Sequence, residues 1–155
     1  MFKEMRRKER QLEETQALNI LHGGEYGVLG TVGENGYPYT VPLNYVFADR
    51  KIYLHCAAAG HKLDNLAFNS KVSFCVVGRY KIVPEKFTTE YESVIVFGRA
   101  SLVEGDEKKE AMIKLVDKYS AAFRAEGEKT IDRVLGRVQV VKIEVDRITG
   151  KRSEG

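Results

Sequence analysis

The strongest constraint on the fold is a pair of strand-like segments joined by a very short connection. Residues 26–32 and 37–47 are rich in β-branched and aromatic residues, and only residues 33–36 (Gly-Glu-Asn-Gly) separate them. The Asn35-Gly36 pair favours a type I′ hairpin, because both central positions of that turn need positive φ. The pattern therefore predicts two neighbouring antiparallel strands.

The second of these strands has two distinct faces. Its apolar positions share one face: Tyr39, Val41, Leu43, Tyr45 and Phe47. Pro42 and Asn44 fall on the other face. Because proline has no backbone N–H to give to a strand ladder, we expect Pro42 at a sheet edge or a bulge.

Strand patterns also dominate the rest of the chain. Four further segments have strand character: residues 51–56, 71–77, 91–103 and 137–147. Helical signals cover residues 9–21, 61–69 and 106–123, with a short helical turn near residues 130–135 and an irregular connection at residues 78–89. Six strands with mostly hairpin connections predict a mainly β protein with flanking helices, an antiparallel six-stranded barrel. We expect a single domain over residues 1–155, with residues 1–8 as a flexible arm.

The composition is that of a globular protein and argues against two classes of partner. The net charge of +3 is too small, and too concentrated at the chain ends, for a typical nucleic-acid surface, so a nucleic-acid-binding barrel is the weakest alternative. No apolar run is long enough to span a membrane, and the N-terminus lacks a secretory signal. Cys56 and Cys75 lie in apolar segments without metal spacing, which indicates reduced thiols and a cytoplasmic protein.

Residues 52–69 contain the most informative polar positions. The segment begins as a strand, passes through small residues at 57–60 and becomes an amphipathic helix. His55, His61 and Lys62 surround this junction, and Lys62 and Asn65 share one helix face. Because amides at a helix N-terminus attract anions, the junction is a candidate site for a phosphate-bearing cofactor. An ordinary crossover with solvated side chains remains the alternative.

Several familiar site architectures are missing from this sequence. It has no glycine-rich dinucleotide or P-loop motif, no helical histidine pair for zinc and no nucleophile elbow. His55 and His61 straddle a loop and support a metal only weakly. Four tyrosines either bracket a planar ring at the barrel mouth or belong to the core: Tyr39, Tyr45, Tyr53 and Tyr91.

Four ordered motifs resemble a known family. Residues 24–30 (GEYGVLG) and 36–45 (GYPYTVPLNY) resemble the opening of the pyridoxamine-phosphate-oxidase-like, FMN-binding split-barrel proteins. Residues 52–62 (IYLHCAAAGHK) and 91–98 (YESVIVFG) resemble the branch associated with resistance to nitroimidazole antibiotics. The resemblance spans residues 5–151. It implies a split β-barrel and a homodimer with two FMN sites at the subunit interface.

The resemblance also implies which residues meet the cofactor. The isoalloxazine edge would contact Pro42, Leu43 and Asn44, and the flavin and ribityl region would contact His55, Cys56 and Ala57. The phosphate would be held by His61, Lys62 and Asn65. The partner subunit would complete the site with Tyr91, Ser93, Val94 and Lys151.

His55 resembles, by its place in these motifs, the family's proposed active-site histidine. At the flavin face, it is a side chain that can donate a proton near neutral pH or stabilise an anion. The simpler alternative is that His55 only hydrogen-bonds the cofactor.

The implied activity is that of an FMN-dependent oxidoreductase that reduces nitroaromatic, nitroimidazole-like or other electrophilic small molecules. One alternative is a non-catalytic flavin- or heme-binding protein for storage or sensing. Another is a pyridoxamine-phosphate-oxidase-like enzyme. The chain lacks the arginine- and tryptophan-rich C-terminal signature of the vitamin-synthesis oxidases, which counts against that last reading.

Overall fold

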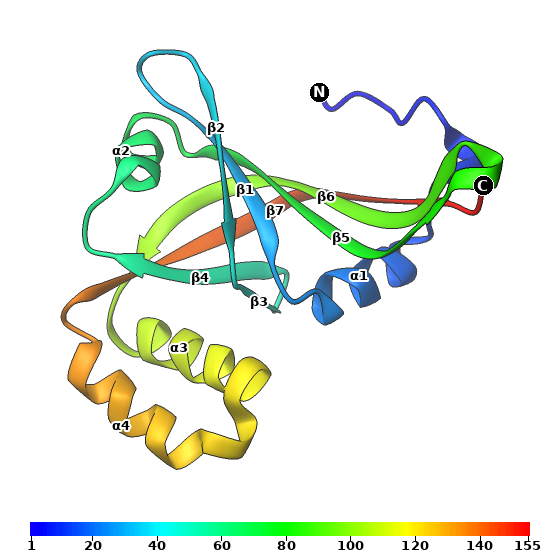
Figure 1. Cartoon of the computed structure of the whole chain (residues 1–155). Coiled ribbons are helices and arrows are strands. Elements are labelled where there is room, and N and C mark those ends of the chain that lie inside the picture. Colours follow the sequence, from blue (N-terminus) through cyan, green and yellow to red (C-terminus); the bar gives the residue numbers. More distant parts are fainter.

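Seven antiparallel strands form one curved sheet around which the helices pack, in a computed structural model that describes residues 1–155 (Figure 1). The strands are β1 (Gly27–Val32), β2 (Pro38–Leu43), β3 (Val46–Ala48), β4 (Lys51–Ala57), β5 (Lys71–Val83), β6 (Thr88–Val103) and β7 (Val138–Ser153). Their order across the sheet is β2-β1-β5-β6-β7-β4-β3. The prediction of a mainly β antiparallel fold is confirmed.

Four α-helices and three 3-10 turns complete the chain. The helices are α1 (Glu14–Gly23), α2 (His61–Phe68), α3 (Gly105–Ser120) and α4 (Arg124–Val134). The turns are η1 (Lys8–Arg10), η2 (Pro84–Lys86) and η3 (Ala121–Phe123). No helix has both the length and the apolar character that a membrane crossing requires. The helices α3 and α4 form a hairpin against one side of the sheet (Figure 1).

The segment predicted as one strand over residues 37–47 is two strands, so the sheet has seven strands where six were expected. The strands β2 and β3 are the two opposite edges of the sheet, yet only Asn44 and Tyr45 connect them. So short a connection spans at most about 11 Å. The two edges therefore approach each other here, and the sheet curls into an incompletely closed barrel.

The hairpin around Asn35-Gly36 is confirmed, but its turn is not of type I′. Gly36 alone has positive φ (77°), and its N–H donates to the Gly33 carbonyl at 2.9 Å. The Asn35 side chain accepts a hydrogen bond from the Tyr37 N–H at 3.0 Å. The longer loop with one left-handed residue replaces a two-residue turn that needs two. As expected, Pro42 lies on an edge strand, β2.

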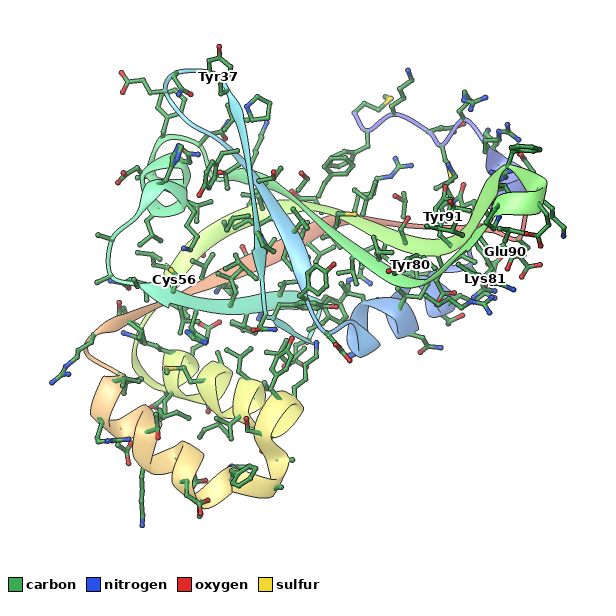
Figure 2. All side chains as sticks on the ribbon, viewed as in Figure 1. Tyr37, Cys56, Tyr80, Lys81, Glu90 and Tyr91 are labelled. Carbon is green, nitrogen blue, oxygen red and sulfur yellow. The ribbon has the colours of Figure 1, made fainter.

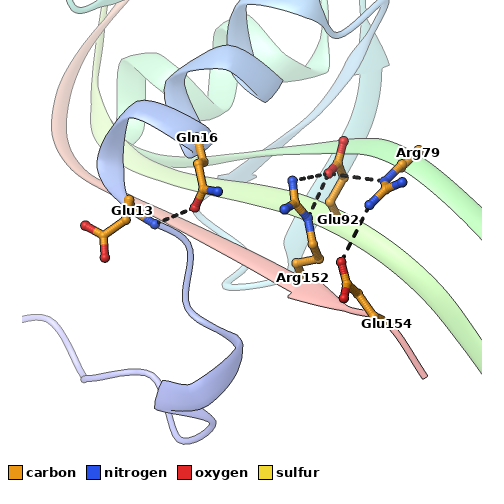
Figure 3. A network of polar contacts seen from close by, with 6 residues as sticks. All are labelled: Glu13, Gln16, Arg79, Glu92, Arg152 and Glu154. Atoms are coloured by element: carbon orange, nitrogen blue, oxygen red, sulfur yellow. Dashed lines mark hydrogen bonds and ion pairs between the residues drawn. The ribbon is translucent and has the colours of Figure 1, made fainter.

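The segment predicted as an irregular connection at residues 78–89 is mostly sheet. The strands β5 and β6 continue as a ladder to Val83 and Thr88, interrupted by a bulge between Val77 and Tyr80. Glu92 of β6 supports this extension, because it accepts two hydrogen bonds from Arg152 (2.9 and 3.2 Å) and lies 3.5 Å from Arg79 (Figure 3). The sequence analysis missed this ladder because the bulge interrupts the strand pattern just before Tyr80. The predicted turn at residues 130–135 is likewise part of a full helix, α4.

Two apolar clusters fill the interior. The larger lies inside the barrel and includes Leu54, Cys56 and Tyr45. The smaller packs the α3–α4 hairpin on the outside of β4 and β7, and includes Tyr53. Tyr45 and Tyr53 are therefore core residues rather than walls of a ring-binding mouth. The Tyr45 hydroxyl donates to the Leu21 carbonyl, and Tyr53 donates to Glu107 at 2.9 Å.

Candidate functional site

The junction between β4 and α2 separates its side chains onto two sides of the sheet. Alternation along β4 directs Leu54 and Cys56 into the barrel, and directs Tyr53 toward the α3–α4 hairpin. His55 is exposed on the same outer side as Tyr53. The histidine and the cysteine next to it therefore face different surroundings.

The start of α2 presents unused hydrogen-bond donors. Gly60 precedes the helix with φ 154° and provides no side-chain cap. The first turn closes with bonds from Leu63 and Asp64 to the Gly60 carbonyl, at 3.0 and 3.2 Å. The backbone N–H groups of His61 and Lys62 have no acceptor in the chain. Such amides are suited to an anion.

Lys62 places a positive charge beside these amides. It forms no salt bridge, and its charge acts on the Cys56 thiol, partly offsetting the rise in pKa that burial causes. A free ammonium group and two free amides fit a phosphate group well. A shallow depression beside α2 is lined by His61 and by the carboxylates of Asp64 and Glu34, and Lys62 is not part of its lining.

Two neighbours fix this end of α2 to the barrel. The His61 ring lies against the Tyr39 ring of β2, with centroids 4.0 Å apart. Asn65 is buried at 4% exposure, and its Nδ2 donates to Thr31 Oγ1 of β1 at 3.0 Å. Its Oδ1 fits against Gly33, where any Cβ would clash. Asn65 thus ties α2 to β1; the phosphate role predicted for it remains a prediction.

His55 and Asn44 share a second, larger space. A cavity of about 660 Å³ lies between β4, α3 and α4 and is lined by both residues. Most of its wall is apolar and comes from the two helices. The structure therefore brings together two residues that the sequence placed at the reactive ring.

Two residues that sequence reasoning missed hold Asn44 in place. The Tyr119 hydroxyl accepts from the Tyr45 N–H (3.1 Å) and donates to the Glu25 carbonyl (2.6 Å). Lys118 donates to the Tyr45 carbonyl at 2.9 Å, with its Nζ 3.8 Å from the centre of the Tyr45 ring. Asn44 itself donates to the Glu25 carbonyl at 2.9 Å. The end of α3 therefore clamps the link between the two sheet edges.

The other predicted site residues of the junction are distributed along the strand ends. Pro42 is exposed on β2, Leu43 packs partly against the barrel core, and Ala57 is exposed at the end of β4.

The structure contains no cluster of three or more histidine, cysteine, aspartate or glutamate side chains that could hold a metal ion. Cys56 and Cys75 are free thiols.

The residues expected from a partner subunit lie at the far end of the sheet. Figure 2 shows Tyr91 well separated from Cys56. Ser93 pairs with Lys151 across β6 and β7, and the Lys151 Nζ lies 5.8 Å from the Tyr91 ring centre. Val94 is fully buried in the barrel core, so only its backbone could face a ligand. Within one chain these residues do not reach His55.

Comparison with models of protein families identifies the family of this chain. The model of the pyridoxamine 5'-phosphate oxidase family matches residues 13–152. This chain belongs to that family. No curated protein matches its sequence.

Solved structures with the same fold differ widely in sequence. A candidate 5-nitroimidazole antibiotic resistance protein from Bacteroides thetaiotaomicron is 24% identical with a TM-score of 0.75, over 92% of this chain and 86% of that one. An FAD- and heme-binding protein from Mycobacterium smegmatis is 18% identical with a TM-score of 0.82, over 94% and 74%. An FAD-binding protein from Mesorhizobium loti is 20% identical with a TM-score of 0.66, over 94% and 98%. At these identities the likeness shows the shared fold.

Proposed function

We propose that this protein is an FMN-dependent oxidoreductase of the cytoplasm that reduces nitroaromatic or similar electrophilic small molecules. The observation that carries the proposal is the junction of β4 and α2. Two free amides and the unpaired Lys62 begin α2, and an exposed histidine that lines a cavity lies near the end of the preceding strand, β4. A protein of this family thus has an anchor for an anion at the start of α2 and a proton donor on the outer face of β4, the strand that precedes this helix.

In this proposal the chain binds FMN through its phosphate. Lys62 and the first amides of α2 hold the phosphate, which leaves the ring system to extend toward His55. When bound, FMN in its reduced form would supply a hydride, that is two electrons and one proton, to a nitro group, which with one further proton becomes a nitroso group and releases one water. His55 donates a proton at the nitro oxygen that leaves. A cytoplasmic two-electron donor would restore the reduced flavin.

A homodimer completes the site in this proposal. The outer face of β5 and β6 exposes three apolar side chains, Val77 (52%), Ile95 (41%) and Phe97 (38%). Tyr91 and Ser93 lie on β6 at the same alternate positions as Ile95 and Phe97, so they share that face. A second copy that covers the apolar residues would also receive these polar groups. Exposed apolar surface of this kind commonly marks an interface.

A non-catalytic flavin- or heme-binding role is the second candidate. It is favoured by the likeness of the fold to a protein described as binding FAD and heme. The same anion anchor would serve a stored cofactor, and His55 would then only contact the ligand. Turnover with a nitro compound separates the two functions.

The Lys62→Ala variant tests the anchor. We expect its affinity for FMN to fall by about tenfold to a hundredfold, because a charge-assisted contact to phosphate is lost. Thermal stability of the flavin-free protein should not change, since Lys62 supports no part of the core. Equilibrium dialysis with FMN measures the effect.

Lys71→Ala is the matched control, because Lys71 is exposed on β5 and forms no salt bridge. It should bind FMN like the wild type. Equal FMN affinity in Lys62→Ala and wild type would contradict the phosphate assignment.

A further inference from the structure

The cavity beside His55 is distinct from the anion anchor in its chemistry. Its walls are mostly apolar: Met112, Leu115 and Val116 of α3, Ile131 and Val134 of α4, and Val138 of β7. A volume of about 660 Å³ lies in the range typical of small-molecule sites. His55 and Asn44 are polar groups on the β4 side of this space.

The charges around the cavity favour one class of ligand. No lysine or arginine lines it, and its ionisable groups are His55, Tyr119 and the carboxylate of Glu126. Glu126 has no side-chain partner in the chain, so its charge is not neutralised by a salt bridge. An anionic ligand would lose its hydration and gain no cation in return. An uncharged aromatic molecule loses little and buries its rings against the apolar helices.

We propose that the cavity between β4 and the α3–α4 hairpin is the binding site of the electron acceptor, and that it selects uncharged planar aromatic molecules over anionic ones. The acceptor enters between the helices and presents its reducible group to His55. The identity of the ligand as an electron acceptor rests on the proposed function, whereas the selection by charge follows from the lining residues.

Methionine methyl resonances test the location directly. The chain has three methionines, and only Met112 lines the cavity, while Met1 and Met5 lie in the N-terminal arm. We expect titration with para-nitrobenzyl alcohol to shift the isotope-labelled methyl signal of Met112 and to leave the other two unchanged. This readout needs neither flavin nor turnover. An unshifted Met112 signal in a protein that reduces the compound would overturn the location.

A pair of variants on α4 tests whether the ligand occupies the cavity. Thr130 is exposed and lines it, and its hydroxyl bonds only along its own helix. Thr130→Trp should fill the space and weaken binding of para-nitrobenzyl alcohol at least about tenfold. Lys129→Trp, on the adjacent position outside the cavity, should bind like the wild type. Equal binding by all three proteins would contradict the proposal.

Charge selection is tested with para-nitrobenzoate, which has nearly the same size but is anionic. The wild type should bind it about tenfold more weakly than the alcohol. Glu126→Lys should remove most of that difference, while Glu110→Lys, an equal charge change on α3 outside the cavity, should keep it. Equal affinity of the wild type for both compounds would overturn the selection. A protein that binds no flavin even with excess FMN, yet still shifts the Met112 signal, would refute the proposed function and leave the site intact.

Discussion

Lys62 and Asn65 lie one turn apart on α2, yet the structure gives them different surroundings. Lys62 is free of salt bridges, whereas Asn65 is buried and bonded to Thr31. The sequence placed both on the phosphate, because helix periodicity shows only that two residues share a face. It cannot show which of them is covered by β1.

Replacement of Asn65 by leucine separates the two roles. If Asn65 ties α2 to β1, Asn65→Leu should lower the free energy of unfolding of the flavin-free protein by about 1–3 kcal/mol, because Thr31 loses its buried partner. Thr31→Val, the other half of the bond, should also be destabilising. Urea unfolding measures both. An Asn65→Leu protein that is as stable as the wild type but fails to bind FMN would instead make Asn65 a phosphate ligand.

Lys118 gives the protein a pH-dependent stability. Burial lowers its pKa from 10.5 to about 8. Between these two values the unfolded chain binds more protons than the folded one, so the Lys118 contribution to stability rises with pH. Below pH 8 the unfavourable burial of the charged ammonium is fully present.

We therefore expect the Lys118→Met variant to gain most free energy of unfolding, relative to the wild type, at neutral pH. That gain should shrink as the pH rises from about 8 to about 10. Urea unfolding of Lys118→Met and of the wild type at several pH values across this range measures the trend. A Lys118→Met difference that stays constant with pH would contradict the burial effect.

At the scale of single elements, the sequence predicted the features that depend only on neighbouring residues. The alternation in β2 and β4, the edge position of Pro42 and the start of α2 all follow from residue type and spacing. The break at Asn44 and Tyr45 does not, because it depends on Lys118 and Tyr119, more than seventy positions away. The continuation of β5 and β6 beyond Val77 was equally hidden, because the bulge between Val77 and Tyr80 interrupts the strand pattern and Pro84 follows soon after.

The outer face of β6 provides a test at this scale. Ile95→Lys places a charge in the centre of the apolar surface formed with Val77 and Phe97, so we expect the proposed dimer to dissociate. Light scattering after size-exclusion chromatography should report half the mass and a loss of bound FMN.

Leu102→Lys is the appropriate comparison for that variant. Leu102 is also exposed on β6, but it lies beyond the bulge at Phe97 and Gly98, on the opposite side of the strand. It should remain dimeric. A wild-type protein that already behaves as a monomer would contradict the proposal that two subunits form the site together.

At the scale of the whole molecule, the fold follows from the closure of the sheet. The two edge strands are adjacent in sequence, so the chain has to bring the sheet edges together, and the barrel encloses one apolar core. The helix α2 follows the end of β4, whereas the α3–α4 hairpin packs on the outer face of β4 and β7. The same fold at identities of 18–24% in other proteins shows how little sequence it requires.

The absorption spectrum of the purified protein tests the central claim most directly. We expect an oxidised-flavin band at roughly 450 nm, with about one FMN released per chain on denaturation. The band should bleach on reduction and return when para-nitrobenzyl alcohol is added. A protein that carries no flavin even after incubation with excess FMN, or that shows only a heme Soret band, would contradict the account.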